Sequence, residues 1–173
     1  MVDLFEESGA NISDCGLYRY NLWRKWGSGP VCTFVMLNPS TADASVDDPT
    51  IRRCRNFAKR EGCDALLVVN LFAFRATNPK DMFAAIDPVG PDNDAHIRDA
   101  VRVAHCHDWP VIAAWGANRK ARARAAEVMA MIGQLKALAI TKEGAPQHPL
   151  YVKGDAPLVG YGSQSRRPDD GVT

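Results

Sequence analysis

Apolar, strand-like runs that alternate with amphipathic helical stretches constrain the fold of this chain most strongly. These runs cover residues 31–37, 65–74, 110–118 and 137–141. Strands that are joined through helices pair in parallel, and helices then cover both faces of the sheet. The sequence therefore predicts an α/β protein with three layers, α/β/α, around a central, mostly parallel four-stranded sheet.

One further strand is expected at the N-terminal side. Residues 16–26 (GLYRYNLWRKW) alternate aromatic and polar side chains, and a Gly-rich turn separates them from the run at 31–37. Two strand patterns around such a turn are typical of an antiparallel hairpin. We therefore expect residues 16–26 to add an antiparallel hairpin strand beside the strand at 31–37.

Three segments read as helices: residues 47–62, 93–108 and 119–133. In the first, Asp48 is placed to cap the helix, Pro49 occupies its first position and Gly62 ends it. In the second, Asn93 or Asp94 is the expected cap. These helices supply the outer layers of the predicted fold.

The length of the chain fits a single domain. Its 173 residues are enough to bury a substantial core, and we assign residues 1–160 to one α/β domain and residues 161–173 to a flexible tail. No apolar run approaches the roughly 20 residues of a membrane span, and the acidic start is no signal peptide. We expect a cytoplasmic monomer that does not bind membranes.

The cysteines argue against a disulfide framework and against a metal site. There are five of them, an odd number, and none forms a C-x-x-C pair. The two closely spaced histidines at 105 and 107 do not make a site by themselves. The sequence therefore predicts packed, reduced thiols, no metal and no cofactor.

Positive charge is local rather than global. The net charge is +1, but basic residues cluster at 52–60 and 119–124. Arginines close to a helix N-terminus suit phosphate, although a solvated helix face is an equally simple explanation. The residues that we assign to phosphate binding are Arg52, Arg53, Arg75, Asn118, Arg119 and Lys153.

Unusual residues follow the predicted parallel strands. NPS begins at Asn38, WGAN begins at Trp115, QHPLY contains His148, and Asn70 interrupts an otherwise apolar strand. In open parallel sheets, ligands gather at the carboxyl ends of the strands. Asn38 could simply form a turn, and His148 could be a packed loop residue. A buried Asn70 costs about 1–3 kcal/mol unless its hydrogen bonds are made, either within the protein or to a ligand.

Together these segments resemble the uracil-DNA glycosylase superfamily, in order and in spacing, from about Val31 to Tyr151. The matching stretches are FVMLNPS, LLVVNLF, VIAAWGANRK and APQHPLY. The resemblance implies that Asn38 aligns the attacking water, that Asn70 reads the base, and that His148 steadies charge on the departing base.

Two departures from that family shape the expected activity. The uracil-specific branch has Asp where this chain has Asn38, so the chain resembles the Asn-type, mismatch-specific branch; Asp43, Asp47 or Asp48 could supply a carboxylate, and we assign Asp48 to the catalytic group. Ser40 stands where that branch has a tyrosine against C5 of the base. Loss of the ring opens space at C5, and we assign Ser40 and Phe72 to base binding with Asn70.

The sequence thus predicts a monofunctional DNA glycosylase that hydrolyses the N-glycosidic bond of a flipped-out, modified pyrimidine. Hydroxymethylated or glucosylated cytosine suits the open C5 side, as in defence against phage. The DNA partner would be a duplex with an extruded base or a single strand. Alternatives are a uracil or mismatch repair glycosylase, a nucleoside- or nucleotide-processing enzyme, and a nucleic-acid-binding module without catalysis.

Overall fold

The computed structural model describes residues 6–41 and 46–162. It is a mixed α/β structure whose described part contains one seven-stranded sheet in the order β1-β2-β4-β3-β5-β6-β7. The elements follow one another as β1 (Glu7–Ile12), β2 (Arg19–Lys25), β3 (Val31–Met36), α1 (Pro49–Arg60), β4 (Ala65–Asn70), α2 (Pro79–Ala84), α3 (Asn93–Cys106), β5 (Val111–Ala113), η1 (Arg119–Ala121), α4 (Arg122–Ile132), β6 (Leu135–Ala137), η2 (Pro149–Tyr151) and β7 (Val159–Tyr161).

The four central strands are parallel, as the sequence predicts. β3 pairs with β4 on one side and β5 on the other, and β5 pairs with β6. The sheet is nevertheless larger than the predicted four strands and one hairpin strand, because β1, β2 and β7 extend it through antiparallel pairs. The carboxyl ends of the four parallel strands lie at one edge, called here the carboxyl edge.

The predicted hairpin between residues 16–26 and 31–37 is wrong. β2 pairs with β1 and with β4, so β4 lies between β2 and β3. The Gly-rich turn therefore carries the chain across a neighbouring strand position instead of reversing it into a hairpin. The fourth strand is also displaced: β6 spans Leu135–Ala137, whereas the sequence suggests 137–141.

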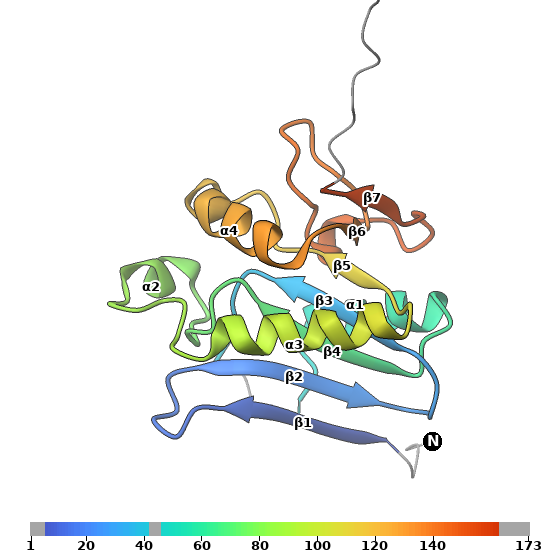
Figure 1. Cartoon of the computed structure of the whole chain (residues 1–173), viewed down its shortest axis with the longest axis horizontal. Helices are drawn as coiled ribbons and strands as arrows, with labels where there is room; N and C mark the ends of the chain where they lie inside the picture. The colour runs from blue at the N-terminus through green and yellow to red at the C-terminus, as the bar shows by residue number, and fades with distance from the viewer. Residues whose placement is uncertain (1–5, 42–45, 163–173) are drawn as a thin grey trace, which may run out of the picture.

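Helices cover both faces of this sheet (Figure 1). α1 packs on one face, where its apolar stripe of Ile51, Cys54, Phe57 and Ala58 joins Leu66 and Val68 of β4. On the other face, α3 and α4 pack against Val35 of β3 and Val69 of β4. Successive strand residues therefore point to opposite layers, as the pleat requires.

The start of α1 follows the sequence prediction closely. Asp48 is the N-cap, its Oδ1 accepts a hydrogen bond from the Ile51 N–H at 2.8 Å, and Pro49 occupies the first turn. Gly62 follows the helix with φ of +74°, a conformation that glycine adopts without steric cost. Asp48 and Pro49 therefore fix where α1 begins, directly beside the carboxyl edge, and Gly62 fixes where it ends.

The start of α3 differs from the prediction. Asp92 is its N-cap residue and makes no side-chain cap hydrogen bond, whereas Asn93 is fully buried. Asn93 Nδ2 donates to the carbonyl oxygens of Asn70 and Leu71, at 3.0 and 3.1 Å. The amide that the sequence offers as a cap therefore holds the end of β4 instead.

At the C-terminal end, β7 reaches Tyr161, so the beginning of the predicted tail (161–173) is part of the sheet. Residues 163–173 lie outside the described residues. No helix in the described ranges is long and apolar enough to cross a membrane.

Candidate functional site

Several polar residues lie at or just beyond the strand ends on the α1 side of the carboxyl edge. They come from the ends of β3 and β4, the N-terminus of α1 and the loop before η2. We call this group the edge site, and its residues are Asn38, Asn70, Asp48, His148, Arg19 and Arg75.

Asn70 is the last residue of β4 and is only 4% exposed. Leu66 and Val68 of the same strand face α1, so alternation places the Asn70 side chain on that face too. Its carboxamide makes no hydrogen bond to any residue in the described ranges, although its backbone oxygen accepts one from Asn93. Its side-chain nitrogen and oxygen are not among the fully enclosed polar atoms that lack a partner, so they can be reached from outside, and a ligand could take up their hydrogen bonds.

Asn38 lies just beyond the end of β3, where Met36 pairs with Asn70. Its Nδ2 donates to the carbonyl oxygens of Pro39 and Ala76, at 3.0 and 2.9 Å. Both amide hydrogens are thereby committed to the loops, which fixes the orientation of the side chain. The Oδ1 atom receives no hydrogen bond from a described residue, so the structure presents an oriented acceptor.

His148 reaches the same edge from the loop before η2. Its Nδ1 accepts the Leu150 N–H at 3.2 Å, so the proton of the neutral ring is on Nε2. Burial lowers the pKa of His148, and the nearby Asp48 carboxylate opposes that shift. The ring is therefore a neutral N–H donor near pH 7.

Two contacts place His148 against neighbouring segments. A Cβ on Gly116, which follows β5, would lie 3.8 Å from the His148 Cβ. On its other side, Arg53 of α1 donates to the carbonyl oxygens of Pro149, at 3.3 Å, and Val152. The histidine is held between the end of β5 and the first turns of α1.

Buried arginines complete the edge site. Arg19 is 6% exposed; burial and the nearby Arg75 lower its pKa, whereas Asp48 raises it. Arg75 donates through Nη1 to the Gly16 carbonyl oxygen at 3.0 Å, and its buried Nε has no partner in the described part of the chain. Positive charge therefore collects near the carboxylate of Asp48.

The candidate carboxylates differ in where they lie and in what they bind. Asp48 is at the edge site, with one oxygen used as the α1 cap. Asp47 accepts hydrogen bonds from Arg24 at 2.7 Å and Arg55 at 2.8 Å. Burial alone would raise the pKa of Asp47, but these two hydrogen bonds outweigh it and hold the pKa below its ordinary value. Asp43 lies outside the described residues.

The structure separates several other predicted residues from the edge site. Phe72 is a core residue that packs edge-on against Phe83, on the α3 side of the sheet. The reason is that β4 ends at Asn70, so the strand alternation that would align Phe72 with Asn70 no longer applies. Ser40 is half-buried in the segment that follows Asn38.

The predicted phosphate-binding residues also differ from one another. Exposed side chains are found at Arg52, Asn118, Arg119 and Lys153. Arg53 is committed to the η2 loop, as described above, and Arg75 is half-buried in the edge site. The Oδ1 of Asn118 caps η1 by accepting the Lys120 N–H at 3.0 Å. Only the exposed group is free to meet a polyanion.

Sequence reasoning missed Arg19 and Arg24. Their segment alternates polar and apolar residues, so both arginines read as solvent-facing. A register shift between β1 and β2, at Asn11 and Ile12, breaks that alternation next to Arg19. Arg19 is buried next to this shift, which no local sequence signal marks. Arg24 lies in the regular part of β2, on the same face as Leu22, and is buried where it pairs with Asp47.

No group of three or more His, Cys, Asp or Glu side chains in residues 6–41 and 46–162 is placed to hold a metal ion. What the edge site offers is an oriented amide oxygen, an uncommitted amide, an imidazole N–H and buried positive charge. Such a set can bind a polar planar group and stabilise negative charge that develops on it.

Comparison with known proteins gives one match. Residues 19–150 match the model of a family described as "Protein of unknown function (DUF1643)". Neither the curated proteins nor the solved structures contain a match. The matched span includes every residue of the edge site.

Proposed function

The chain belongs to the DUF1643 family, and from the chemistry of the edge site we propose that it is a DNA glycosylase that acts on a modified pyrimidine. The observation that carries the proposal is the Asn70 carboxamide, which is 4% exposed and has no hydrogen-bond partner among the described residues. A carboxamide offers donors and an acceptor in one plane, which matches the edge of a pyrimidine. The resemblance of the four loops to the uracil-DNA glycosylase superfamily supports the same proposal.

The reaction follows from the roles of three side chains. The Oδ1 of Asn38 accepts a hydrogen bond from a water molecule whose oxygen forms a bond to C1′ of the sugar. The bond between C1′ and N1 of the base breaks, and its electron pair leaves with the base. The proton of the water is finally taken up by the departing base, because Asn38 cannot accept it as a carboxylate would.

Negative charge on the leaving base is stabilised by His148 and the buried arginines. The Nε2–H of His148 donates to O2 of the base, and a well-placed donor of this kind contributes about 3–4 kcal/mol. Arg19 adds buried positive charge to the edge site, close to Arg75 and Asp48, without needing direct contact with the base. Asp48 raises the pKa of His148, and the Leu150 N–H, which the Nδ1 atom accepts, leaves Nε2 as the donor.

Access to this edge requires that the nucleotide leaves the base stack. Leu150 and Tyr151 directly follow the histidine loop and are 47% and 81% exposed. Large side chains so exposed at the rim of a site suit insertion into the gap that an extruded base leaves. The exposed basic residues, Arg52, Arg119 and Lys153, would contact phosphate.

The mixed α/β fold supports this proposal, since its four parallel strands end at one edge, where open parallel sheets bind their ligands. The edge site is proposed to accept a C5 substituent such as hydroxymethyl or a sugar, because Ser40 replaces the tyrosine found in the uracil-specific branch. Defence against phage that carry such bases is a context in which this activity would serve.

The test is mass spectrometry of bases released from duplex and single-stranded DNA containing uracil, 5-hydroxymethylcytosine or glucosylated cytosine. Wild-type protein is expected to release a C5-modified base, and Asn70→Ala to release none, while Asn56→Ala, an exposed asparagine on α1, behaves as wild type. Exclusive action on uracil would refute the open C5 side. DNA binding without release from any substrate would make the chain a binding module instead.

A further inference from the structure

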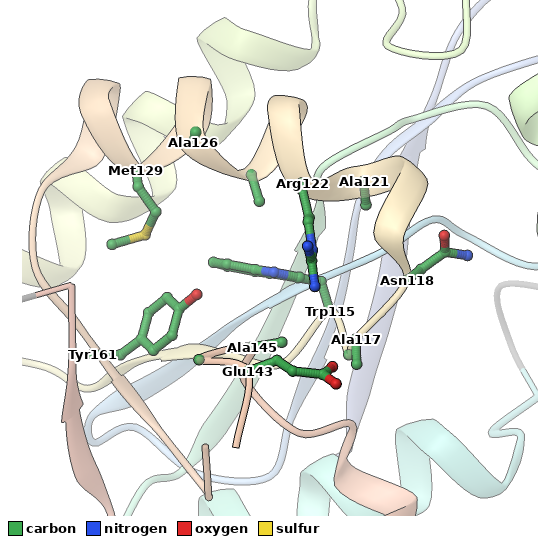
Figure 2. A pocket seen from close by; sticks show the side chains of 13 residues that line it. Trp115, Ala117, Asn118, Ala121, Arg122, Ala126, Met129, Glu143, Ala145 and Tyr161 are labelled. Carbon is green, nitrogen blue, oxygen red and sulfur yellow. The ribbon is translucent and has the colours of Figure 1, made fainter. Parts of the chain in front are cut away.

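A pocket lies at the carboxyl edge, beyond the end of β5 and on the side of the sheet that α4 covers. It has a volume of about 340 Å³ and is bounded by the end of β5, by α4, by the loop at 143–145 and by Tyr161 of β7. We call it the Trp115 pocket (Figure 2). Alanines and glycines on its walls, at 116, 117, 125, 126, 144 and 145, leave the space open.

The floor of the Trp115 pocket is aromatic. Trp115 and Tyr161 meet edge-to-face, with ring centroids 5.5 Å apart and planes at 79°. Met129 lies beside them at the same end of the pocket (Figure 2). Flat, polarisable surfaces of this kind stack on nucleobases.

Trp115 also offers the pocket a hydrogen-bond donor. The residue is 4% exposed, yet its indole N–H has no acceptor among the described residues. An indole N–H usually finds a partner when it is buried. Because Trp115 lines the pocket, an acceptor on a ligand could take this hydrogen bond.

One basic and one acidic side chain lie at the mouth of the pocket. Arg122 extends from α4 and Glu143 from the opposite loop, toward the same end of the pocket (Figure 2). Both are exposed, and no salt bridge joins either to a residue in the described ranges. Arg119 and Lys120 are exposed nearby and add positive charge outside the mouth.

This combination selects among nucleobases. A carboxylate only accepts hydrogen bonds, and its two oxygens match the adjacent N1–H and N2–H donors of guanine. Guanidinium groups pair with O6 and N7 of the same base. Thymine and uracil present a single imide N–H between two carbonyl oxygens, which a carboxylate repels.

We propose that the Trp115 pocket binds the guanine of a nucleotide that neighbours the extruded one, with Glu143 on its Watson–Crick edge and Arg122 beside O6. The assignment rests on the proposed function for its DNA context, and on the pocket alone for guanine binding. Gly116 belongs to the pocket and also approaches His148. A strand bound at the edge site would therefore pass this pocket within about one or two nucleotides, and the glycosylase would prefer a guanine at that flanking position.

Binding of deoxynucleoside monophosphates tests the pocket without any base release. The indole N–H resonance of Trp115 is followed by NMR during titration with dGMP, dAMP, dCMP and dTMP, and with deoxyinosine monophosphate, which lacks the N2 amine. We expect dGMP to bind at least tenfold more tightly than the other four nucleotides. Equal binding of dGMP and dTMP would overturn the proposal.

Two substitutions locate the interaction. Glu143→Gln is exposed at the mouth, and we expect it to weaken dGMP binding at least tenfold, whereas Asp99→Asn on α3 leaves it unchanged. Ala145→Leu fills the pocket and is expected to abolish the Trp115 shift, while Ala95→Leu, an exposed position on α3, does not. Unchanged binding in both pocket variants would place the guanine site elsewhere and overturn the assignment.

The DNA arm separates this proposal from the glycosylase proposal. Base release is measured from oligonucleotides in which guanine, inosine, adenine or thymine occupies each position next to the modified base. Guanine dependence that Glu143→Gln removes supports both proposals. Base release without a preference for the flanking base overturns the flanking assignment alone. The guanine that the pocket binds would then belong to a free nucleotide and not to DNA. Selective dGMP binding with no base release from any DNA overturns the glycosylase and leaves the guanine pocket standing.

Discussion

Two buried asparagines meet at the end of β4, on opposite sides of the sheet, and the chain uses them differently. On the α3 side, Asn93 spends both amide hydrogens on the carbonyl oxygens of Asn70 and Leu71. Arg124 of α4 donates to the Leu71 oxygen at 2.9 Å and pairs with Asp94. On the α1 side, the Asn70 carboxamide makes no hydrogen bond to a described residue.

This difference separates polar groups that hold the fold together from polar groups that are available to a ligand. On the α3 side, hydrogen bonds from Asn93 of α3 and Arg124 of α4 hold the end of β4 between these two helices. On the α1 side, the Asn70 amide has no protein partner in the described ranges and its polar atoms are not fully enclosed, which is the pattern expected where a ligand completes the hydrogen bonds. Burial alone would not distinguish the two residues. The partners of their NH₂ groups do, although the Oδ1 of Asn93 is itself buried without a partner in the described part of the chain.

The largest expected effect comes from removing the amide on the α1 side. Asn70→Ala should lower base release by roughly 10²–10³-fold, the loss found for a single well-placed stabilising group. It should change the free energy of unfolding little, because no protein hydrogen bond is lost. Single-turnover kinetics and urea denaturation measure the two quantities. A large loss of stability with full activity would reverse the roles assigned to the two sides.

The converse change is Asn93→Ala. It removes two hydrogen bonds to the end of β4, so we expect the free energy of unfolding to fall by about 2 kcal/mol. Chemical denaturation monitored by circular dichroism measures this loss. Base release at a temperature where the variant is folded should stay within a few-fold of wild type. An activity loss as deep as that of Asn70→Ala would show that the comparison fails.

Asp48 serves both the fold and the site, and two substitutions separate these roles. Asp48→Ala removes the N-cap of α1 and should cost about 1 kcal/mol of stability. Asp48→Asn keeps a cap acceptor and should be close to wild type in stability, but it removes the charge that faces His148 and Arg19. Thermal unfolding of both variants, with base release measured alongside, distinguishes the contributions. Equal destabilisation by both would assign the residue to charge alone.

The smallest expected effect is a shift in the pH dependence. Burial lowers the pKa of His148, so the neutral ring is favoured in the folded protein. The contribution of the neutral ring to base release is complete above pH 6.5, the ordinary pKa of histidine, and is lost as the pH falls through the lowered pKa of His148. The acid limb of base release should therefore lie below pH 6.5. Because Asp48 raises this pKa, Asp48→Asn should move the limb to still lower pH; movement to higher pH would contradict the assignment.

Much of the carboxyl edge could be predicted from local patterns. The cap of α1 and its apolar stripe are written in consecutive residues, and the Asn in an apolar strand already marks Asn70 as a buried amide. The pairing of β2 could not be predicted, because a Gly-rich turn does not reveal that β4 will lie between β2 and β3. Pairing of distant strands depends on the whole sheet.

The roles of Arg124 and Arg19 could not be predicted from the sequence, for the same reason. Arg124 belongs to a basic run that reads as a phosphate-binding face, yet it is buried and bound to β4 and α3. Arg19 reads as exposed and is buried through a register shift. Sequence patterns identify which side chains are polar, but tertiary pairing decides which of them are already satisfied.

The most direct test of this account follows the side-chain amides of the two asparagines themselves. In ¹⁵N–¹H spectra, the NH₂ resonances of Asn70 and Asn93 are assigned from Asn→Ala variants and observed during titration with single-stranded DNA carrying 5-hydroxymethylcytosine. The account predicts that the Asn70 resonances shift with DNA concentration while those of Asn93 stay in place. At saturating DNA, an unmoved Asn70 signal would contradict it.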